Sequence, residues 1–183
     1  VAVGAIRDDG SVAGSAFSLV TPRTNAVPVN IEDHPPLPDA LLGGLDAAWS
    51  GLGGQPVLAP GQDATAVAQL IDGRANSGMG WRESTTALPQ DLTVQLAGDQ
   101  PVPVAGFVLD PRGWDDIPSH QVAEFEIDLS SDGVTFTKAV SGTLSIAGVE
   151  QAFVLDTPVN ARFARLRVIS AQDPTPGTIH LGE

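Results

Sequence analysis

The sequence predicts an all-β sandwich from about residue 57 to the end of the chain. Short segments alternate apolar and polar residues with the period of two typical of a strand, as do Leu92, Val94 and Leu96. Turn signals separate these segments, and the chain contains 20 glycines and 15 prolines. After Gly54 no stretch keeps a helical period over about eleven residues. Together these features favour a β-sandwich or barrel.

The first 45 residues have a different pattern. Partial alternation flanks Asp9-Gly10, a dipeptide typical of a hairpin turn. Prolines at 28, 35, 36 and 38 then exclude a regular helix and interrupt central strands. We therefore predict an N-terminal hairpin and an extended proline-rich strap over 1–45, followed by the sandwich over 46–183. Asp39 is expected to cap a short helical turn that ends at Gly43-Gly44.

The strand candidates follow one another along the rest of the chain. Residues 101–111 are mostly apolar, so we predict a strand buried on both sides. Phe163, Leu166 and Val168 do not share one phase of alternation, which predicts a bulge near Ala164. The expected strands lie within residues 55–60, 91–96, 101–111, 122–130, 134–140, 151–159, 161–170 and 179–183.

Composition narrows the possible functions. The net charge of −13 repels nucleic acid and anionic lipid, and favours a monomer. No apolar run reaches the roughly 18 residues of a membrane span, so we expect no membrane insertion. The chain has no cysteine, which excludes disulfides, thiol nucleophiles and cysteine-ligated metals. Because it begins at Val1 rather than Met, we expect a piece of a larger protein.

Motifs for catalysis are absent from the sequence. The three histidines, His34, His120 and His180, lack the spacing of a metal-binding pair, and no nucleophile elbow or phosphate-binding loop occurs. The carboxylates lie beside turn glycines or on the polar faces of strands, where solvated carboxylates are usual. A non-catalytic protein is expected, and a hydrolase would require two carboxylates converging at glycosidase spacing.

Four motifs occur in an order that resembles a known family. They are Ile-Asp-Gly at 71–73 leading to Trp81, Ser-Ser-Asp-Gly-Val-Thr-Phe at 130–136, Ala-Arg-Phe-Ala-Arg-Leu-Arg-Val at 161–168 and Leu-Gly-Glu at 181–183. From about residue 57 onward the chain resembles discoidin or F5/8 type C domains, which include family 32 carbohydrate-binding modules. The resemblance implies an eight-stranded, discoidin-like jelly-roll sandwich with a galactose-binding-like fold and ligand loops at one end.

The resemblance also implies a role and a cofactor. We expect a binding module of a larger secreted or cell-surface protein, with carbohydrate as the first ligand class. A protein ligand, or docking onto a neighbouring domain of the same polypeptide, is the alternative. Relatives carry a structural calcium ion, for which Asp72 and Glu183 would supply carboxylates and the loop from Arg74 to Ser77 carbonyl oxygens. Alternatively, Asp72-Gly73 only forms a turn.

The loop from Arg112 to His120 is the candidate ligand site. It joins two core strands and combines an aromatic, two carboxylates and two basic side chains. Sugars need an aromatic face for their C–H groups and planar polar groups for their hydroxyls. The alternative is that Trp114 packs back onto the sandwich. The predicted ligand residues are Arg112, Trp114, Asp115, Asp116 and His120. Arg82 is predicted to line an adjacent side of the same site.

Two further groups of side chains are predicted to stabilise the fold rather than to bind a ligand. Trp81 is predicted to fill one end of the core. Arg162, Arg165 and Arg167 are predicted to stack or to pair with the carboxylates of 124–128 rather than to bind a ligand.

Overall fold

The computed structural model describes residues 37–74, 80–113, 117–146, 148–173, 175 and 177–183, together with two short backbone segments nearer the N-terminus. In those segments β1 (Ala5–Ile6) pairs antiparallel with β2 (Val12–Ala13), while Asp9-Gly10, the predicted hairpin turn, lies outside the described residues. Within the described ranges no helix has the length and apolar character needed to cross a membrane.

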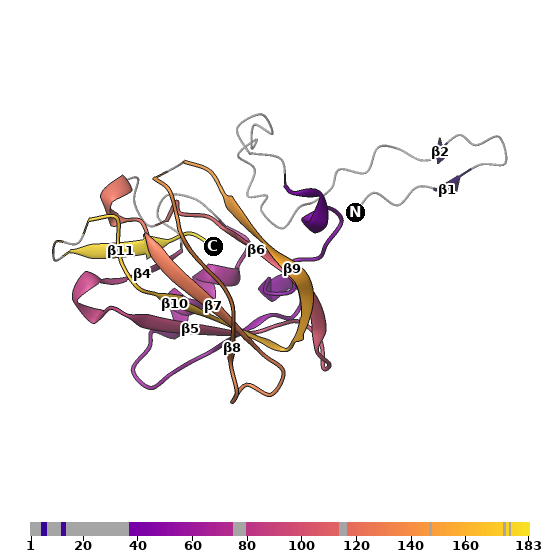
Figure 1. Cartoon of the computed structure of the whole chain (residues 1–183), viewed down its shortest axis with the longest axis horizontal. Helices are drawn as coiled ribbons and strands as arrows, with labels where there is room; N and C mark the ends of the chain where they lie inside the picture. Colours follow the sequence, from indigo (N-terminus) through magenta and orange to yellow (C-terminus); the bar gives the residue numbers. More distant parts are fainter. Residues whose placement is uncertain are drawn as a thin grey trace.

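One layer of the sandwich is a five-stranded antiparallel sheet in the order β3-β5-β10-β7-β8 (Figure 1). The alternation in the sequence correctly predicts its inner face, because Leu92, Val94, Phe125, Ile127 and Leu129 are all buried. The strands are β3 (Gln55–Val57), β5 (Gln90–Gln95), β7 (Glu124–Ser130), β8 (Thr137–Thr143) and β10 (Phe163–Val168).

Two antiparallel pairs complete the sandwich. The strand β6 (Val102–Leu109) pairs with β9 (Gln151–Ala161), with a register shift between Val104 and Gly106. The strand β4 (Trp81–Ser84) pairs with β11 (Thr178–Leu181) at one end. Trp81 is 3% exposed and belongs to the core, as predicted.

Short helical segments lie between the strands. Asp63 caps α1 (Ala64–Ala68) by accepting a hydrogen bond from the Thr65 amide, and η4 (Gln69–Ile71) continues it. The predicted turn near the end of the strap is η2 (Asp39–Leu41), but Pro38 rather than Asp39 holds its N-cap position, without a side-chain cap. The remaining segments are η3 (Ser50–Leu52), η5 (Thr85–Ala87) and η6 (Pro118–His120).

The prediction that 101–111 is buried on both sides is wrong. Most residues of β6 are only half-buried. Among the described strands β6 pairs with β9 alone, so the two form a sheet of two strands. An apolar cavity of about 380 Å³ also separates β6 from the five-stranded sheet, beneath residues 37–48.

The predicted bulge near Ala164 is also absent. From Phe163 to Val168, β10 pairs without a register shift with both β5 and β7. Val168 is fully buried and Leu166 packs against the core, which places Phe163, Arg165 and Arg167 on the outer face. The mixed phase in the sequence arises because Phe163 belongs to the outer face.

The arginines on this face have structural partners. Arg165 Nη2 lies 2.6 Å from Asp128 Oδ2, and its guanidinium lies 4.3 Å from the centroid of the Phe136 ring. Arg167 Nη1 lies 3.6 Å from Asp91 Oδ1. The guanidinium of Arg162 lies over the ring of Phe163. The pairing of Arg165 with a carboxylate of 124–128 confirms the structural interpretation for that residue.

Candidate functional site at one end of the sandwich

Three loops from distant parts of the sequence meet at the end of the sandwich that carries β4 and β11 (Figure 1). They follow β6, β8 and β10, and Gln172 connects them. Its Nε2 donates to the carbonyl oxygens of Val122 at 3.1 Å and Leu144 at 2.6 Å. Its backbone N–H donates to Gln121, and that of Asp173 donates to Ser119. We call the described residues of these segments, 110–113, 117–123, 144–146, 148–150, 169–173, 175 and 177, the loop cluster.

Arg112 is held in place by a buried carboxylate. Asp110 is 1% exposed, and its backbone pairs with Gly182 and Glu183 after β11. The Nε and Nη2 atoms of Arg112 lie 2.9 Å from Oδ1 and 2.5 Å from Oδ2 of Asp110. These hydrogen bonds raise the pKa of Arg112 above its usual value, although burial opposes the shift. Within the described ranges no hydrogen bond engages the remaining atom, Nη1.

His180 lies at the centre of the basic residues predicted as ligand contacts. It is fully buried on β11, and its ring centroid lies 6.2 Å from that of His120 in an edge-to-face arrangement. His180 also pairs in register with Arg82 on β4, so the two side chains project from the same face. Gly113 packs so closely on His180 that a Cβ there would lie 2.9 Å from Cδ2 of the ring. The fold thus brings the His120 ring, the Arg82 position on β4 and the Arg112–Gly113 backbone to the end of the sandwich where His180 lies.

Sequence reasoning did not assign a role to His180. The only available signal was its place between Ile179 and Leu181 in a short terminal strand, which alone does not distinguish an exposed from a buried histidine. Trp114, Asp115 and Asp116 lie outside the described residues, so their roles as ligand contacts stay predictions.

The residues predicted to bind calcium lie on two segments. Asp72 ends η4, and its Oδ1 accepts a hydrogen bond of 2.9 Å from the Arg74 amide, while the Arg74 side chain is exposed. Desolvation by burial raises the pKa of Asp72. Glu183 follows β11, whose end contacts Gly80 closely. Ser77 lies outside the described residues.

The described residues alone do not form a complete metal site. No group of three or more His, Asp or Glu side chains among them is arranged to hold a metal ion. A carboxylate in partly desolvated surroundings, such as Asp72, nevertheless suits a hard cation. Any calcium site here would need backbone oxygens as further ligands.

Comparison with known families and solved structures identifies the family of this chain and its fold. A family model described as the F5/8 type C domain matches residues 58–180, which is about two thirds of the chain. The chain belongs to the F5/8 type C domain family. The match includes the loop cluster, β4 and His180 at its last residue, but not residues 37–57 or Glu183. No curated protein matches the chain.

Solved structures of family 32 carbohydrate-binding modules have the same fold. The module from Streptococcus pneumoniae EndoD has 18% identity and a TM-score of 0.55, covering 70% of this chain and 91% of that one. The module from C. perfringens NanJ, in complex with galactose, has 22% identity and a TM-score of 0.54, covering 71% and 88%. A module from a Clostridium perfringens family 31 glycoside hydrolase has 18% identity and a TM-score of 0.57, covering 76% and 90%. These similarities confirm the discoidin-like sandwich.

Proposed function

We propose that this F5/8 type C domain is a non-catalytic module that binds carbohydrate through its loop cluster, within a larger secreted or cell-surface protein. The observation that carries the proposal is that the fold places Arg82, Arg112 and His120, from β4 and the loop after β6, at the same end of the sandwich as His180. Three donors from separate strands and loops form a polar surface of the kind that recognises sugar hydroxyls.

Arg112 is the strongest single candidate for a ligand contact. Asp110 fixes two of its nitrogen atoms, so the guanidinium loses little further freedom when a ligand binds. Nη1 can then donate to a sugar oxygen. Trp114, two residues later in the sequence, supplies the aromatic face that the proposal also requires.

The solved relatives support sugar as the ligand class. Besides the galactose complex of the NanJ module, CpGH89CBM32-5 from Clostridium perfringens was solved in complex with GalNAc-β-1,3-galactose. Both share the fold at TM-scores of 0.54 and 0.52. We propose glycans as the ligands of this chain, with galactose-type sugars as the first to test.

Two of the described carboxylates in the loop cluster, Asp110 and Asp173, favour binding over catalysis. A general acid at neutral pH needs a raised pKa. The pKa of Asp173 is lowered instead, chiefly because the Thr175 backbone N–H donates to it at 2.9 Å. Asp110 is buried in its ion pair with Arg112. Both carboxylates therefore serve structure.

The experiment is a glycan array followed by calorimetry on the hits. Arg112→Lys keeps a cation for Asp110 but removes the second donor branch, and should weaken binding on the order of tenfold. Arg167→Lys, on the outer face of the five-stranded sheet, is the matched control and should bind normally. Absence of any glycan ligand, or an Arg112→Lys variant that binds like the wild type, overturns the proposal.

We also propose that calcium stabilises the end of the sandwich near Asp72. The Asp72 and Glu183 carboxylates would hold it together with carbonyl oxygens of the loop that includes Arg74 and Ser77. A bound cation would compensate the desolvation of the Asp72 carboxylate and link the loop to the C-terminal strand. It would serve stability rather than chemistry.

Docking onto a neighbouring domain is the second candidate function. Large apolar side chains are exposed on both sides of Trp49 in the sequence, with Leu45 at 76% before it and Leu52 at 43% after it. Such a surface suits a protein partner. Hydrogen exchange over residues 37–58 should then be slower in the natural full-length polypeptide than in this chain. Equal exchange in both would count against docking.

A further inference from the structure

A second pocket opens between the strap, the segment of the loop cluster that follows β8, and the start of β9. Its volume is about 400 Å³, within the range of small-molecule sites. None of its lining residues belongs to the Arg112–His120 loop, and Leu37 and Pro38 precede the segment matched by the family model. The other lining residues are Val108, Thr143, Ser145, Val149, Glu150, Gln151, Ala152 and Phe153.

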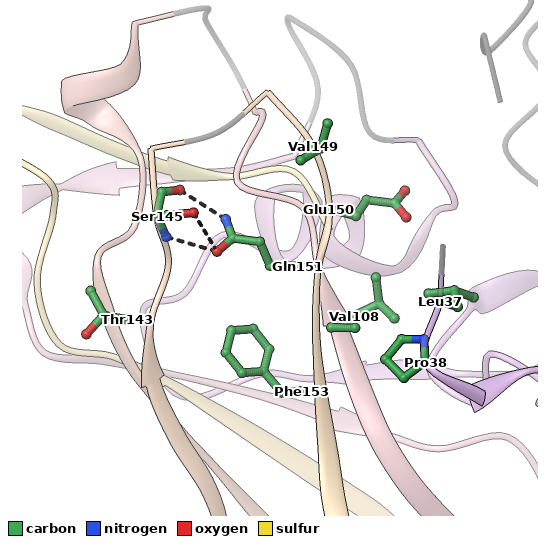
Figure 2. Close-up of a pocket in the computed structure, with 10 residues that line it drawn as sticks. Leu37, Pro38, Val108, Thr143, Ser145, Val149, Glu150, Gln151 and Phe153 are labelled. Atoms are coloured by element: carbon green, nitrogen blue, oxygen red, sulfur yellow. Dashed lines mark hydrogen bonds between the residues drawn. The ribbon is translucent and has the colours of Figure 1, made fainter. Parts of the chain in front are cut away.

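The ring of Phe153 forms the aromatic surface of this pocket. In Figure 2 Thr143 and Ser145 lie on one side of the ring, and Leu37 and Pro38 lie on the other. The half-buried ring packs edge-to-face on the buried Phe125, with centroids 4.8 Å apart. Gly142 admits this arrangement, because a Cβ there would lie 3.1 Å from the Phe153 ring. The ring is therefore held in one orientation.

Polar groups surround the ring. The Gln151 amide makes three hydrogen bonds to Ser145: its Oε1 accepts from the backbone N–H at 2.9 Å and from Oγ at 3.0 Å, and its Nε2 donates to the carbonyl at 3.0 Å. These bonds, drawn in Figure 2, lock the β8–β9 connection beside Phe153. The exposed Thr143 hydroxyl and the Glu150 carboxylate add acceptors to the rim.

We propose that this pocket is a second carbohydrate subsite, which takes a neutral pyranose residue of an oligosaccharide held elsewhere at Arg112. It rests on the function proposed above and extends it from single sugars to chains. A fixed aromatic face suits the C–H side of a pyranose, and the Thr143 hydroxyl, the second Nε2 hydrogen of Gln151 and the Glu150 carboxylate suit its hydroxyls. The Glu150 carboxylate and the net charge of −13 disfavour acidic sugars.

The pocket and Arg112 are neighbours along the chain. Val108 lines the pocket, and Arg112 lies four residues later in the chain. Four residues span at most about 14 Å even when fully extended, so their Cα atoms lie within that distance. A short oligosaccharide spans such a gap.

The test compares monosaccharides with oligosaccharides that contain them, using calorimetry on the full 183-residue chain. The wild type should bind the oligosaccharide at least fivefold more tightly, on the order of one aromatic contact. Phe153→Leu keeps apolar volume for the packing on Phe125 but removes the aromatic face, and should lose most of that gain. Phe136→Leu, the same change on the other sheet, should keep it.

The outcomes separate this inference from the function on which it rests. If the wild type binds no glycan, both proposals fail. If Arg112→Lys weakens binding but Phe153→Leu keeps the full oligosaccharide gain, only the second subsite is wrong. Glu150→Gln should improve binding of glycans with an acidic residue relative to neutral ones. A wild type that prefers acidic glycans would contradict the assignment to neutral sugars.

Discussion

The side-chain amide of Gln172 donates a hydrogen bond of 2.6 Å to the carbonyl oxygen of Leu144, a residue 28 positions away that is fully buried. The same Nε2 atom also bonds to the Val122 carbonyl. One side chain thus satisfies two backbone acceptors in two other loops, and the shape of the loop cluster depends on it.

Gln172→Leu should lower the free energy of unfolding by about 1–3 kcal/mol, because it leaves two backbone carbonyls without their donor. Urea denaturation would measure the loss. Gln90→Leu is the matched control, since that amide donates to the Ala87 carbonyl in the adjacent η5 and joins no two loops among the described residues. An equal effect of the two substitutions would show that Gln172 has no special role between the loops.

Gly113→Ala should disturb the site through His180. The added Cβ would lie 2.9–3.1 Å from three atoms of that buried side chain, so either the ring or the Arg112 loop must move. We expect a destabilisation of about 1–3 kcal/mol and weaker glycan binding. Gly148→Ala, where nothing lies within 4 Å, should change neither. Unaltered melting and binding of Gly113→Ala would show that the contact yields without consequence.

Arg165 and Phe136 should be energetically coupled on the outer face of the sheet. The guanidinium lies over the ring at 4.3 Å while bonding to Asp128. In a double-mutant cycle with Arg165→Met and Phe136→Leu, we expect a coupling of about 0.5–1 kcal/mol. Additive effects in chemical denaturation would mean that the stacking contributes nothing beyond the separate side chains.

Asp132 should make the stability of the β7–β8 turn depend on pH in the acid range. It accepts hydrogen bonds from the Thr135 and Val134 amides and from Ser130 Oγ, which lower its pKa from 3.8 to about 2. Because the folded-state pKa is depressed, the stabilisation is present above about pH 4 and is lost as the pH falls toward 2.

The measurement compares melting temperatures of the wild type and Asp132→Asn across pH. The variant should melt lower near neutral pH, and the difference should shrink between about pH 4 and pH 2. Asp99→Asn, in an exposed turn, serves as the control. A difference that stays constant down to pH 2 would contradict the depressed pKa.

Calcium removal should lower the melting temperature if the ion binds near Asp72. Excess chelator should shift the midpoint by several degrees, since ligand well above its Kd adds about 2–4 kcal/mol of stability. Asp72→Asn should melt at the lower temperature and no longer respond to chelator. A wild type whose melting is indifferent to chelator and added calcium would exclude a stabilising ion.

Much of the fold was predictable because strand alternation is a local property. The pattern in 92–96 and 124–129 correctly identified the inner face of the main sheet, and Trp81 was correctly assigned to the core. The strand over 101–111 is less buried than predicted, because an apolar run does not reveal how many strands or layers pack against it. The bulge predicted in β10 is absent because Phe163 faces outward. The sequence alone does not indicate an outward-facing phenylalanine, whose ring is covered by Arg162 in the structure.

The candidate site was likewise predicted only in part from the sequence. Arg82, Arg112 and His120 were predicted from residue type and loop position, and the structure brings them to the same end of the sandwich. The pocket at Phe153 had no signal in the sequence. It exists because residues 37–38, 108 and 143–153 meet, and no local pattern records that contact.

The sequence by itself determined an all-β sandwich, its family through four ordered motifs, and a charge unsuited to nucleic acid. Those properties follow from side-chain periodicity, local turns and composition, which each segment carries on its own. Only the tertiary structure decided that His180 lies buried among the predicted ligand residues, that Gln172 joins three loops, and that the strap completes a second pocket. These depend on contacts between residues far apart in the chain, whose geometry is set by how the whole sandwich packs.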